Sequence, residues 1–329
     1  MSSWLRSSAL LVALSFASAS IPADDAVRVT AIRHPVDKSY RKMVSGMDLF
    51  EQMHALAPDA TLRYRLYPRK RGTDMGIGAV YVVGDQVDVP IAVAADNTFT
   101  LRRDLPEDAV VRSERRADTM TWRADIRTPR LPPHTRRLGD LRLECLVGMQ
   151  AGLVSQYPNF LSQLFRFLER PREFCGRAEV PYLFFADRPV FAVTLHAGER
   201  RRTVSVGNLY AGIAHGRTPE DERKYCDCEA LLDRAYTLPL GDSSWPDDTL
   251  VELQYMQPAP ATDAYGAFIG STKSDIRAAF GSAKVLSFDS GYEVWAYDFG
   301  PMQKPALERE ELVLLFDRSD TVIAARHRE

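Results

Sequence analysis

The sequence lacks an excess of charge of either sign. It has 42 lysines and arginines against 44 acidic residues in 329 positions, a formal net charge of −2. This balance gives no global field for binding nucleic acid or an anionic membrane, so neither is expected as a partner surface. Hydrophobic residues make up 45% and charged residues 26%, which excludes disordered, collagen-like and coiled-coil chains.

The sequence also lacks the short motifs of common enzyme classes. It contains no His-Glu-x-x-His zinc motif, no Gly-x-Ser-x-Gly nucleophile elbow and no Walker phosphate loop. His215 and Arg217 lie in one Gly-containing loop, where an imidazole can bind an anion or move a proton near neutral pH. A solvated loop is the more ordinary interpretation of this segment. The sequence therefore assigns no catalytic residue, no metal and no cofactor.

Long apolar runs are absent except near the N-terminus. Arg6 precedes an apolar run over 9–17, and Ala17-Ser18-Ala19 is a small-x-small cleavage site. This pattern is typical of a Sec-type signal peptide over residues 1–19. No later segment offers about 18 uncharged apolar residues, so we expect no transmembrane segment in the mature chain. No cysteine follows the cleavage site, and a lipid anchor is not expected. The predicted location is the periplasm, with association with the outer membrane as a further possibility.

Cysteine is scarce, and export gives the four cysteines a structural interpretation. An even number in an oxidising compartment predicts disulfides. A bridge between Cys226 and Cys228 would close a strained, very short ring, so we expect both to pair with Cys145 and Cys175. The alternatives are a zinc site formed by His215 with Cys226 and Cys228, or a redox-active Cys-x-Cys, although the spacing is unusual for either.

The predicted fold class is α+β, in three regions after the signal peptide. Residues 20–130 are expected to form a mainly β domain with one amphipathic helix over 39–56. Short alternating segments predict an antiparallel sandwich or barrel, with strands near 27–33, 62–66, 79–83, 87–93, 98–102, 109–113 and 121–126. The segment from Val89 to Asp104 also resembles the strand-turn-strand of transthyretin-like sandwich domains.

Residues 131–257 are expected to form a disulfide-containing α+β domain. The Pro- and Arg-rich segment 127–140 predicts an extended, exposed connector in front of it. The remaining expectations are strands over 141–145, 181–185, 190–196, 202–206 and 250–255, and helices over 148–168 and 218–232.

Residues 258–329 carry the clearest local signals. Thr262-Asp263 can cap a first short helix, Ser271 or Thr272 can cap a second one over 273–280, and Gly281 can end that helix. Alternating residues then predict strands near 292–297, 312–316 and 321–325. Val294 is expected on one face of the first strand, with Trp295 and Tyr297 on the other.

This C-terminal segment resembles the SmpA/OmlA family, the BamE-like domain of outer-membrane protein assembly. The residues in the family's positions are Gly270, Ser271, Asp275, Ile276, Phe280-Gly281, Trp295, Tyr297 and Phe316-Asp317. The sequence departs from the family in having no lipid-bearing cysteine and in having Ser282-Ala283 where a proline is usual. The resemblance implies a two-helix, three-stranded antiparallel module that contacts other proteins and does not catalyse a reaction.

The leading hypothesis is therefore a periplasmic, non-enzymatic interaction or scaffold protein of the cell envelope, with an envelope protein or lipid as its partner. Trp295 and Tyr297 are binding candidates if they face away from the helices. The alternative is an envelope hydrolase or small-ligand-binding protein with a site in the middle region near His215.

Overall fold

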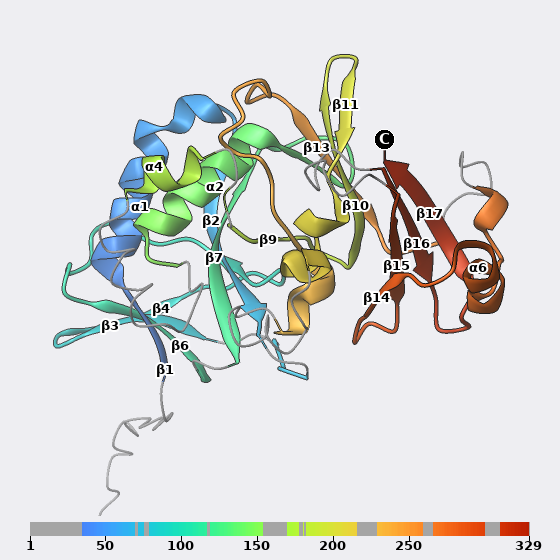
Figure 1. Cartoon of the computed structure of the whole chain (residues 1–329). Coiled ribbons are helices and arrows are strands. Elements are labelled where there is room, and N and C mark those ends of the chain that lie inside the picture. The colour runs from blue at the N-terminus through green and yellow to red at the C-terminus, as the bar shows by residue number, and fades with distance from the viewer. Residues whose placement is uncertain are drawn as a thin grey trace, which may run out of the picture. The chain divides into compact units, whose positions relative to one another are not determined.

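The fold combines helices with several antiparallel sheets, which confirms the α+β class (Figure 1). The computed structural model describes residues 35–69, 72–75, 79–116, 119–153, 170–177, 180, 182–215, 229–258, 266–299 and 310–328. All strand pairings in these ranges are antiparallel, and none of the sheets closes into a barrel, so the barrel alternative is wrong.

The first helix forms where the sequence predicts it. Helix α1 (Tyr40–Gln52) begins after Ser39, whose hydroxyl accepts a hydrogen bond from the backbone N–H of Lys42. A short 3₁₀ turn, η1 (His54–Leu56), follows α1. Tyr40 and Met43 are buried, so the predicted amphipathic face packs on its own domain.

Two sheets pack against α1. One has the strand order β1 (Pro35–Ser39), β6 (Val110–Arg116), β3 (Val80–Gly84) and β4 (Val87–Ile91). The other has the order β5 (Thr98–Phe99), β2 (Thr61–Pro68) and β7 (Met120–Arg127). One hydrophobic core joins Val82 and Val111 of the first sheet to Tyr64 and Trp122 of the second. Of the predicted strands, 27–33 lies outside the described residues.

The segment 127–140 is not the exposed connector that its composition predicts. Strand β8 (Thr135–Arg137) pairs with β13 (Leu250–Tyr255), and α2 (Leu138–Gln150) follows immediately. Arg136 and Asp140 are buried. The prolines lie in the turns before β8. Arg127 finds its acceptor Asp187 60 positions away, and Arg136 finds Ile126 and Glu144 within ten positions, which composition does not show.

The predicted strand over 141–145 is wrong, because these residues lie in α2. This helix is buried around most of its surface, with Leu141, Leu143, Cys145 and Val147 all inaccessible. It lies beside α1 and against β7 (Figure 1). A helix surrounded by other elements is apolar on every side and loses the 3.6-residue pattern that identifies a surface helix. Gly139 allows close packing here, since an added Cβ would lie 2.0 Å from the carbonyl oxygen of Leu56.

The middle region contains a four-stranded sheet with the order β11 (Arg200–Thr203), β10 (Val190–Ala197), β13 and β8. Strands β10 and β13 confirm the strands predicted over 190–196 and 250–255. The partner of β10 begins two residues earlier than the predicted 202–206 and ends at Thr203. A second pair joins β9 (Phe184–Phe185) to β12 (Ala235–Tyr236). Short helical segments complete the region: α4 (Pro171–Cys175), η2 (Val206–Asn208), η3 (Tyr210–His215) and η4 (Glu229–Arg234). Most of the predicted helices over 148–168 and 218–232 lies outside the described residues.

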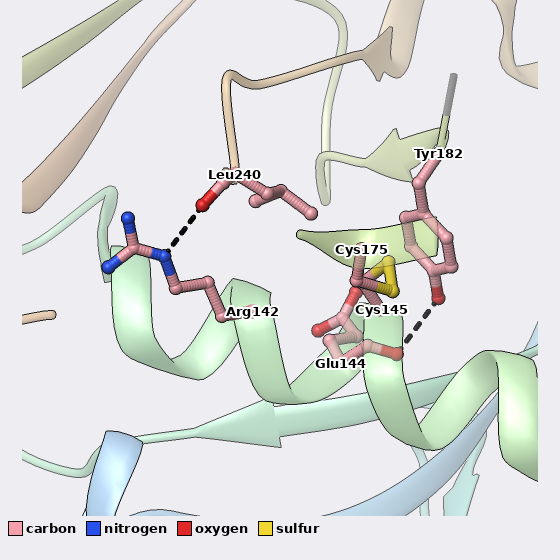
Figure 2. Close-up of a disulfide and its surroundings, with 6 residues drawn as sticks. All are labelled: Arg142, Glu144, Cys145, Cys175, Tyr182 and Leu240. Atoms are coloured by element: carbon pink, nitrogen blue, oxygen red, sulfur yellow. Dashed lines mark hydrogen bonds between the residues drawn. A yellow bond between two sulfur atoms is a disulfide. The ribbon is translucent and has the colours of Figure 1, made fainter. Parts of the chain in front are cut away.

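The expected cysteine pairing is wrong for two of the four residues. Cys145 of α2 and Cys175 of α4 form a disulfide with each other, with their Cα atoms 6.1 Å apart (Figure 2). Both cysteines are buried. The helical path of α2, which the sequence did not predict, turns Cys145 toward α4. Cys226 and Cys228 lie outside the described residues.

The C-terminal module comprises η5 (Gly266–Phe268), α6 (Lys273–Phe280) and a sheet with the order β14 (Lys284–Ser287), β15 (Glu293–Asp298), β16 (Glu311–Phe316) and β17 (Val322–Arg328). Thr272 and Asp275 form a reciprocal capping box at the start of α6, and Gly281 ends it, as predicted. The sheet has one strand more than expected, because the short strand β14 was missed. The helix expected after Thr262 lies outside the described residues.

Both faces of this sheet are covered. Trp295, Leu314 and Phe316 pack with Ile276 of α6, whereas Val294 and Val313 belong to the core that contains Phe191 of β10. Glu311 accepts hydrogen bonds from the Ser205 hydroxyl and, at 3.0 Å, from the backbone N–H of Val206. Residues 32–329 accordingly form one unit. None of the helices in the described part of the chain has the length and hydropathy needed to cross a bilayer.

Candidate functional site

The two aromatic residues predicted as binding candidates are core residues. Trp295 is 2% exposed and Tyr297 is 5% exposed. The Trp295 indole N–H donates to a carboxylate oxygen of Glu293 at 2.6 Å, and the Tyr297 ring packs on Phe280 of α6. The two residues are binding candidates only if they face away from the helices. Both side chains face α6, so they are not available to a partner.

The remaining predicted site residues lie largely beyond the described structure. His215 ends η3, but its side chain is outside the described residues, as is the whole of Arg217. Their role in a loop site stays a prediction. His196, interpreted from the sequence as a hydrogen-bonded residue at a strand end, lies near the end of β10 with Nε2 2.8 Å from a carboxylate oxygen of Glu252.

Two exposed apolar side chains lie on the C-terminal module. Val285 and Phe299, 46% and 50% exposed, are the exposed large hydrophobic residues of the described chain. Val285 is in register with Trp295, and Phe299 follows Tyr297 by two residues with its ring stacked on the Tyr297 ring at 6.2 Å. Alternation along a strand therefore places both on the α6 side of the sheet. Val285 belongs to β14, at one edge of that sheet.

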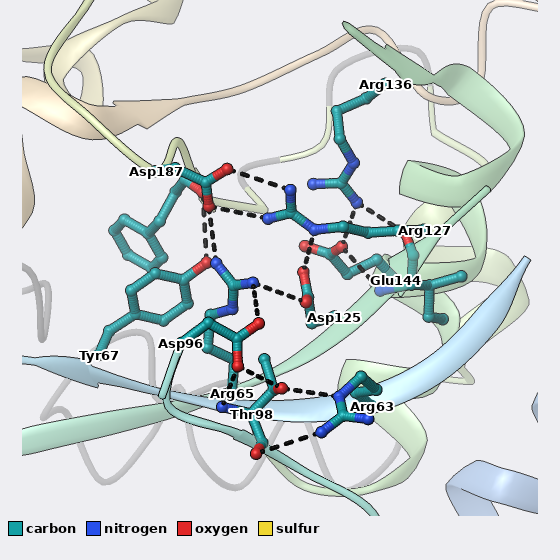
Figure 3. Close-up of polar contacts among 12 residues, drawn as sticks. Arg63, Arg65, Tyr67, Asp96, Thr98, Asp125, Arg127, Arg136, Glu144 and Asp187 are labelled. Atoms are coloured by element: carbon teal, nitrogen blue, oxygen red, sulfur yellow. Dashed lines mark hydrogen bonds and ion pairs between the residues drawn. The ribbon is translucent and has the colours of Figure 1, made fainter. Parts of the chain in front are cut away.

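A second candidate site is a polar network between the N-terminal and middle regions (Figure 3). The Arg127 Nε donates to Asp125 at 2.8 Å, and its terminal nitrogens donate to Asp187 at 2.9 and 3.1 Å. Arg65 donates to Asp187 at 2.6 Å and lies 3.1 Å from Asp125. Each arginine thus contacts both carboxylates, and Arg65 also lies 3.5 Å from Asp96, so the cluster contains two arginines and three aspartates.

A buried ion pair lies beside this cluster. Nη2 of Arg136 donates to a Glu144 oxygen at 2.8 Å and to the carbonyl of Ile126 at 2.7 Å. Burial raises the pKa of Glu144, and the charge of Arg136 opposes that shift without cancelling it. Within the described residues, Nε of Arg136 has no hydrogen-bond partner. This buried nitrogen is therefore a donor without a described acceptor.

Three buried tyrosines border the network. Burial raises the pKa of Tyr67 to about 12, so its hydroxyl stays neutral at ordinary pH. Tyr182 donates to the carbonyl oxygen of Glu144 at 3.1 Å (Figure 2). The hydroxyl of Tyr236 finds no hydrogen-bond partner among the described residues. The ion pair is consequently buried among aromatic side chains, and burial strengthens its electrostatic interaction.

A small pocket opens next to Arg136. Its volume is about 90 Å³, and β8, β13 and the end of β9 supply its walls. Arg127, Arg136 and Asp187 are its charged lining residues, and Phe185, Leu253 and Tyr255 also line it. The pocket surface is mainly polar, and the pocket is smaller than the roughly 300–1,000 Å³ that is usual for sites of small organic ligands.

The network makes stability depend on acid pH. Burial alone would raise the pKa of Asp187, but hydrogen bonds and charge from Arg127, with the charge of Arg65, lower it to about 2. A carboxyl whose folded pKa is depressed contributes stability that is present above about pH 4 and is lost as the pH falls toward 2. Asp187→Asn should therefore be less stable than the parent at pH 7 and lose less stability between pH 4 and pH 2. Urea unfolding at each pH measures both effects.

The matched control for this prediction is Asp85→Asn in the exposed β3–β4 turn. It makes the same change of charge, and Asp85 has no ion pair with a described residue. We expect this variant to keep the acid dependence of the parent. Equal acid dependence in the Asp187 variant and the parent would contradict the assignment to Asp187.

Sequence reasoning missed this site, although one signal for it exists. Charged residues recur at every second position as Arg63 and Arg65 in β2, and as Arg123, Asp125 and Arg127 in β7. Such spacing places charges on one face of each strand, and two adjacent strands with that pattern indicate a polar face held by other parts of the chain. The partner Asp187 lies 122 positions from Arg65, and no local pattern connects them.

Comparisons of the chain with protein-family models, with curated proteins and with solved structures give no match, so the site stands on its geometry alone.

Proposed function

We propose that this chain is a non-enzymatic contact protein of the cell envelope that binds an extended segment of a partner protein at its C-terminal module. The carrying observation is that Val285 and Phe299, the exposed large hydrophobic residues of the described chain, both lie on this module, Val285 on the edge strand β14 and Phe299 just beyond the end of β15. Exposed apolar side chains at a sheet edge are costly for an isolated protein and are typical of a contact surface.

The edge position of β14 suits an extended partner. No described strand pairs with the second side of β14, so its outward peptide groups can pair with an added strand. Lys284 precedes Val285 and points to the opposite face of β14, where an added strand would also present side chains. Burial lowers the pKa of its ammonium group. It forms no ion pair with a described residue, so a carboxylate from outside would stabilise its charge. The partner segment is therefore extended, apolar and acidic.

Two further observations support the envelope location. The N-terminal sequence has the pattern of a signal peptide, and the disulfide between Cys145 and Cys175 suits an oxidising compartment. The resemblance of residues 262–329 to the BamE-like domain supports a role in protein contact. Since its sheet shares a core with the middle region, the experiment uses the full chain.

The test is site-specific photocrosslinking in envelope preparations. A benzoylphenylalanine probe at position 285 should form one dominant protein adduct, whereas a probe at the exposed position of Gln86 should not. Phe299→Asp and Lys284→Glu should each abolish the adduct at 285, with little change in stability because Phe299 is half-exposed. Mass spectrometry should place the crosslink in an acidic, extended segment of another protein.

Three outcomes would overturn the proposal. The adduct could persist in the Phe299→Asp and Lys284→Glu variants, or a probe at position 86 could form it equally. Either result would show that the surface around Val285 does not bind a partner specifically. An adduct to a second copy of this chain would show that this surface mediates self-association instead.

A further inference from the structure

Alternate peptide groups of β14 face away from the C-terminal sheet, and the backbone hydrogen bonds of the β14–β15 hairpin identify them. The backbone N–H of Phe288 donates to the carbonyl of Tyr292 at 3.0 Å, which closes the hairpin. Residues that exchange backbone hydrogen bonds with an antiparallel neighbour recur at every second position. Leu286 therefore bonds to β15, whereas the peptide groups of Val285 and Ser287 point outward.

The other side of β15 gives the same alternation. The backbone N–H of Phe299 donates to the carbonyl of Glu310 at 3.0 Å, so Phe299 bonds in the direction of β16. Trp295 lies four positions earlier in this alternation and also bonds to β16, and it is the cross-strand neighbour of Val285. The outer edge of β14 thus presents the N–H and C=O groups of Val285 and Ser287, and no described strand pairs with this edge.

We propose that this edge binds an antiparallel, amphipathic strand of a partner protein, with apolar side chains on the α6 side and acidic side chains on the other side. The inference rests on the proposed function and adds the direction, the register and the alternation of the bound segment. The pairings within this sheet are all antiparallel, and antiparallel pairing is the more stable kind per residue. An added antiparallel strand would therefore continue the sheet.

The two faces of β14 differ in the side chains that they present. Val285 is exposed on the α6 side, where an apolar side chain directly opposite would cover it. Lys284 and Leu286 point to the other side. Leu286 is buried, but Lys284 forms no ion pair with a described residue, so an acidic side chain opposite Lys284 would complete a cross-strand pair of opposite charge. An alternating segment presents both kinds of side chain at once.

Amide exchange measured by NMR on the full chain tests the edge directly. In the free protein, the N–H groups of Val285 and Ser287 should exchange faster than that of Leu286, which bonds to β15. A capped seven-residue peptide in which glutamate and valine alternate should protect both amides in a saturable way and leave Leu286 unchanged. A peptide of the same composition with its three valines consecutive should not protect them, because its valines do not share one side of a strand.

Methylation of the peptide nitrogens determines the direction of the bound strand. In an antiparallel pair, the residue opposite Val285 exchanges both backbone hydrogen bonds with it and shares its side of the sheet, whereas in a parallel pair the flanking residues supply these bonds. Methyl groups on the valine nitrogens should therefore weaken binding at least about tenfold, and methyl groups on the glutamate nitrogens should leave it nearly unchanged.

A charge exchange tests the side that faces Lys284. The Lys284→Glu protein should lose affinity for the alternating glutamate peptide and gain affinity for the same peptide with lysine in place of glutamate. The parent protein should show the opposite preference. This exchange separates the loss of an ion pair from damage to the strand, because damaged protein would bind neither peptide.

Four results would overturn the inference. Val285 and Ser287 could exchange as slowly as Leu286 in the free chain, or the alternating peptide could protect neither amide. The peptide with consecutive valines could bind equally well, or the peptide methylated on glutamate could lose affinity while the one methylated on valine keeps it. An adduct at position 285 that depends on Phe299 and Lys284 would still support the proposed function in each case, so the two failures are distinguishable.

Discussion

Replacing Asp125 by alanine is expected to lower the free energy of unfolding by about 3–5 kcal/mol. The Asp125 side chain is buried, accepts a hydrogen bond from Arg127 at 2.8 Å and lies 3.1 Å from Arg65 in an ion pair. Without it, Arg65, whose side chain is largely buried, keeps only Asp187 and Asp96 as partners among the described residues, and Arg127 keeps Asp187. Removing one member of a buried ionic network leaves the desolvation penalty of the others uncompensated. Urea denaturation of the full chain at pH 7 measures the loss.

The control for Asp125→Ala is Asp104→Ala. Asp104 pairs with Arg102, and both side chains are 62% exposed. An exposed ion pair contributes less than about 1 kcal/mol, so this variant should resemble the parent. Asp125→Asn should lie between the two, since it keeps hydrogen-bond acceptors but loses the charge. Similar losses for Asp104→Ala and Asp125→Ala would show that burial of the network does not determine its contribution.

The network also connects the candidate pocket to the N-terminal sheets. Arg65 and Asp125 belong to β2 and β7, whereas Asp187 forms part of the pocket wall. The Asp187 carboxylate accepts hydrogen bonds from Arg65 at 2.6 Å and from Arg127 at 2.9 and 3.1 Å, and Arg65 lies outside the pocket lining. Loss of Asp125 should therefore loosen the position of Asp187 as well as lower stability, even though Asp125 does not line the pocket.

The elements that the sequence predicts well are those with local signals. Helix α6 was placed correctly because Thr272 and Asp275 cap its start and Gly281 ends it. Strand β13 was placed correctly because its buried and exposed residues alternate strictly. In both cases, residues within a few positions of one another determine whether the segment forms a helix or a strand.

The elements that the sequence does not predict depend on distant partners. Helix α2 is apolar because α1, β7 and α4 surround it, and its alternating leucines imitate a strand. Arg136 is charged and lies in a proline-rich segment, which favoured an exposed connector. It is buried because Glu144 and the carbonyl of Ile126 accept its hydrogen bonds. Composition reports the cost of burying such a residue but not the contacts that offset it.

The aromatic residues of β15 show a further limit. Alternation correctly placed Trp295 and Tyr297 opposite Val294, but it does not say which face meets solvent. Both faces are covered, one by α6 and the other by the middle region. The exposed residues are instead Val285, on a short strand that the sequence did not reveal, and Phe299, just beyond the end of β15.

Removing the disulfide by the double change Cys145→Ala and Cys175→Ala should cost about 3–4 kcal/mol, because the bridge closes a loop between residues 30 positions apart and restricts the unfolded chain. Urea unfolding under non-reducing conditions measures this loss. Cys226→Ala with Cys228→Ala is the matched control, and peptide mapping of that variant should still recover the Cys145–Cys175 crosslink. A crosslinked peptide joining Cys145 or Cys175 to either of the other two cysteines in the parent protein would contradict the pairing. Since the bridge fastens α4 to the buried helix α2, its loss should also raise amide exchange in α4 more than in the C-terminal sheet, which Cys145 and Cys175 do not constrain directly.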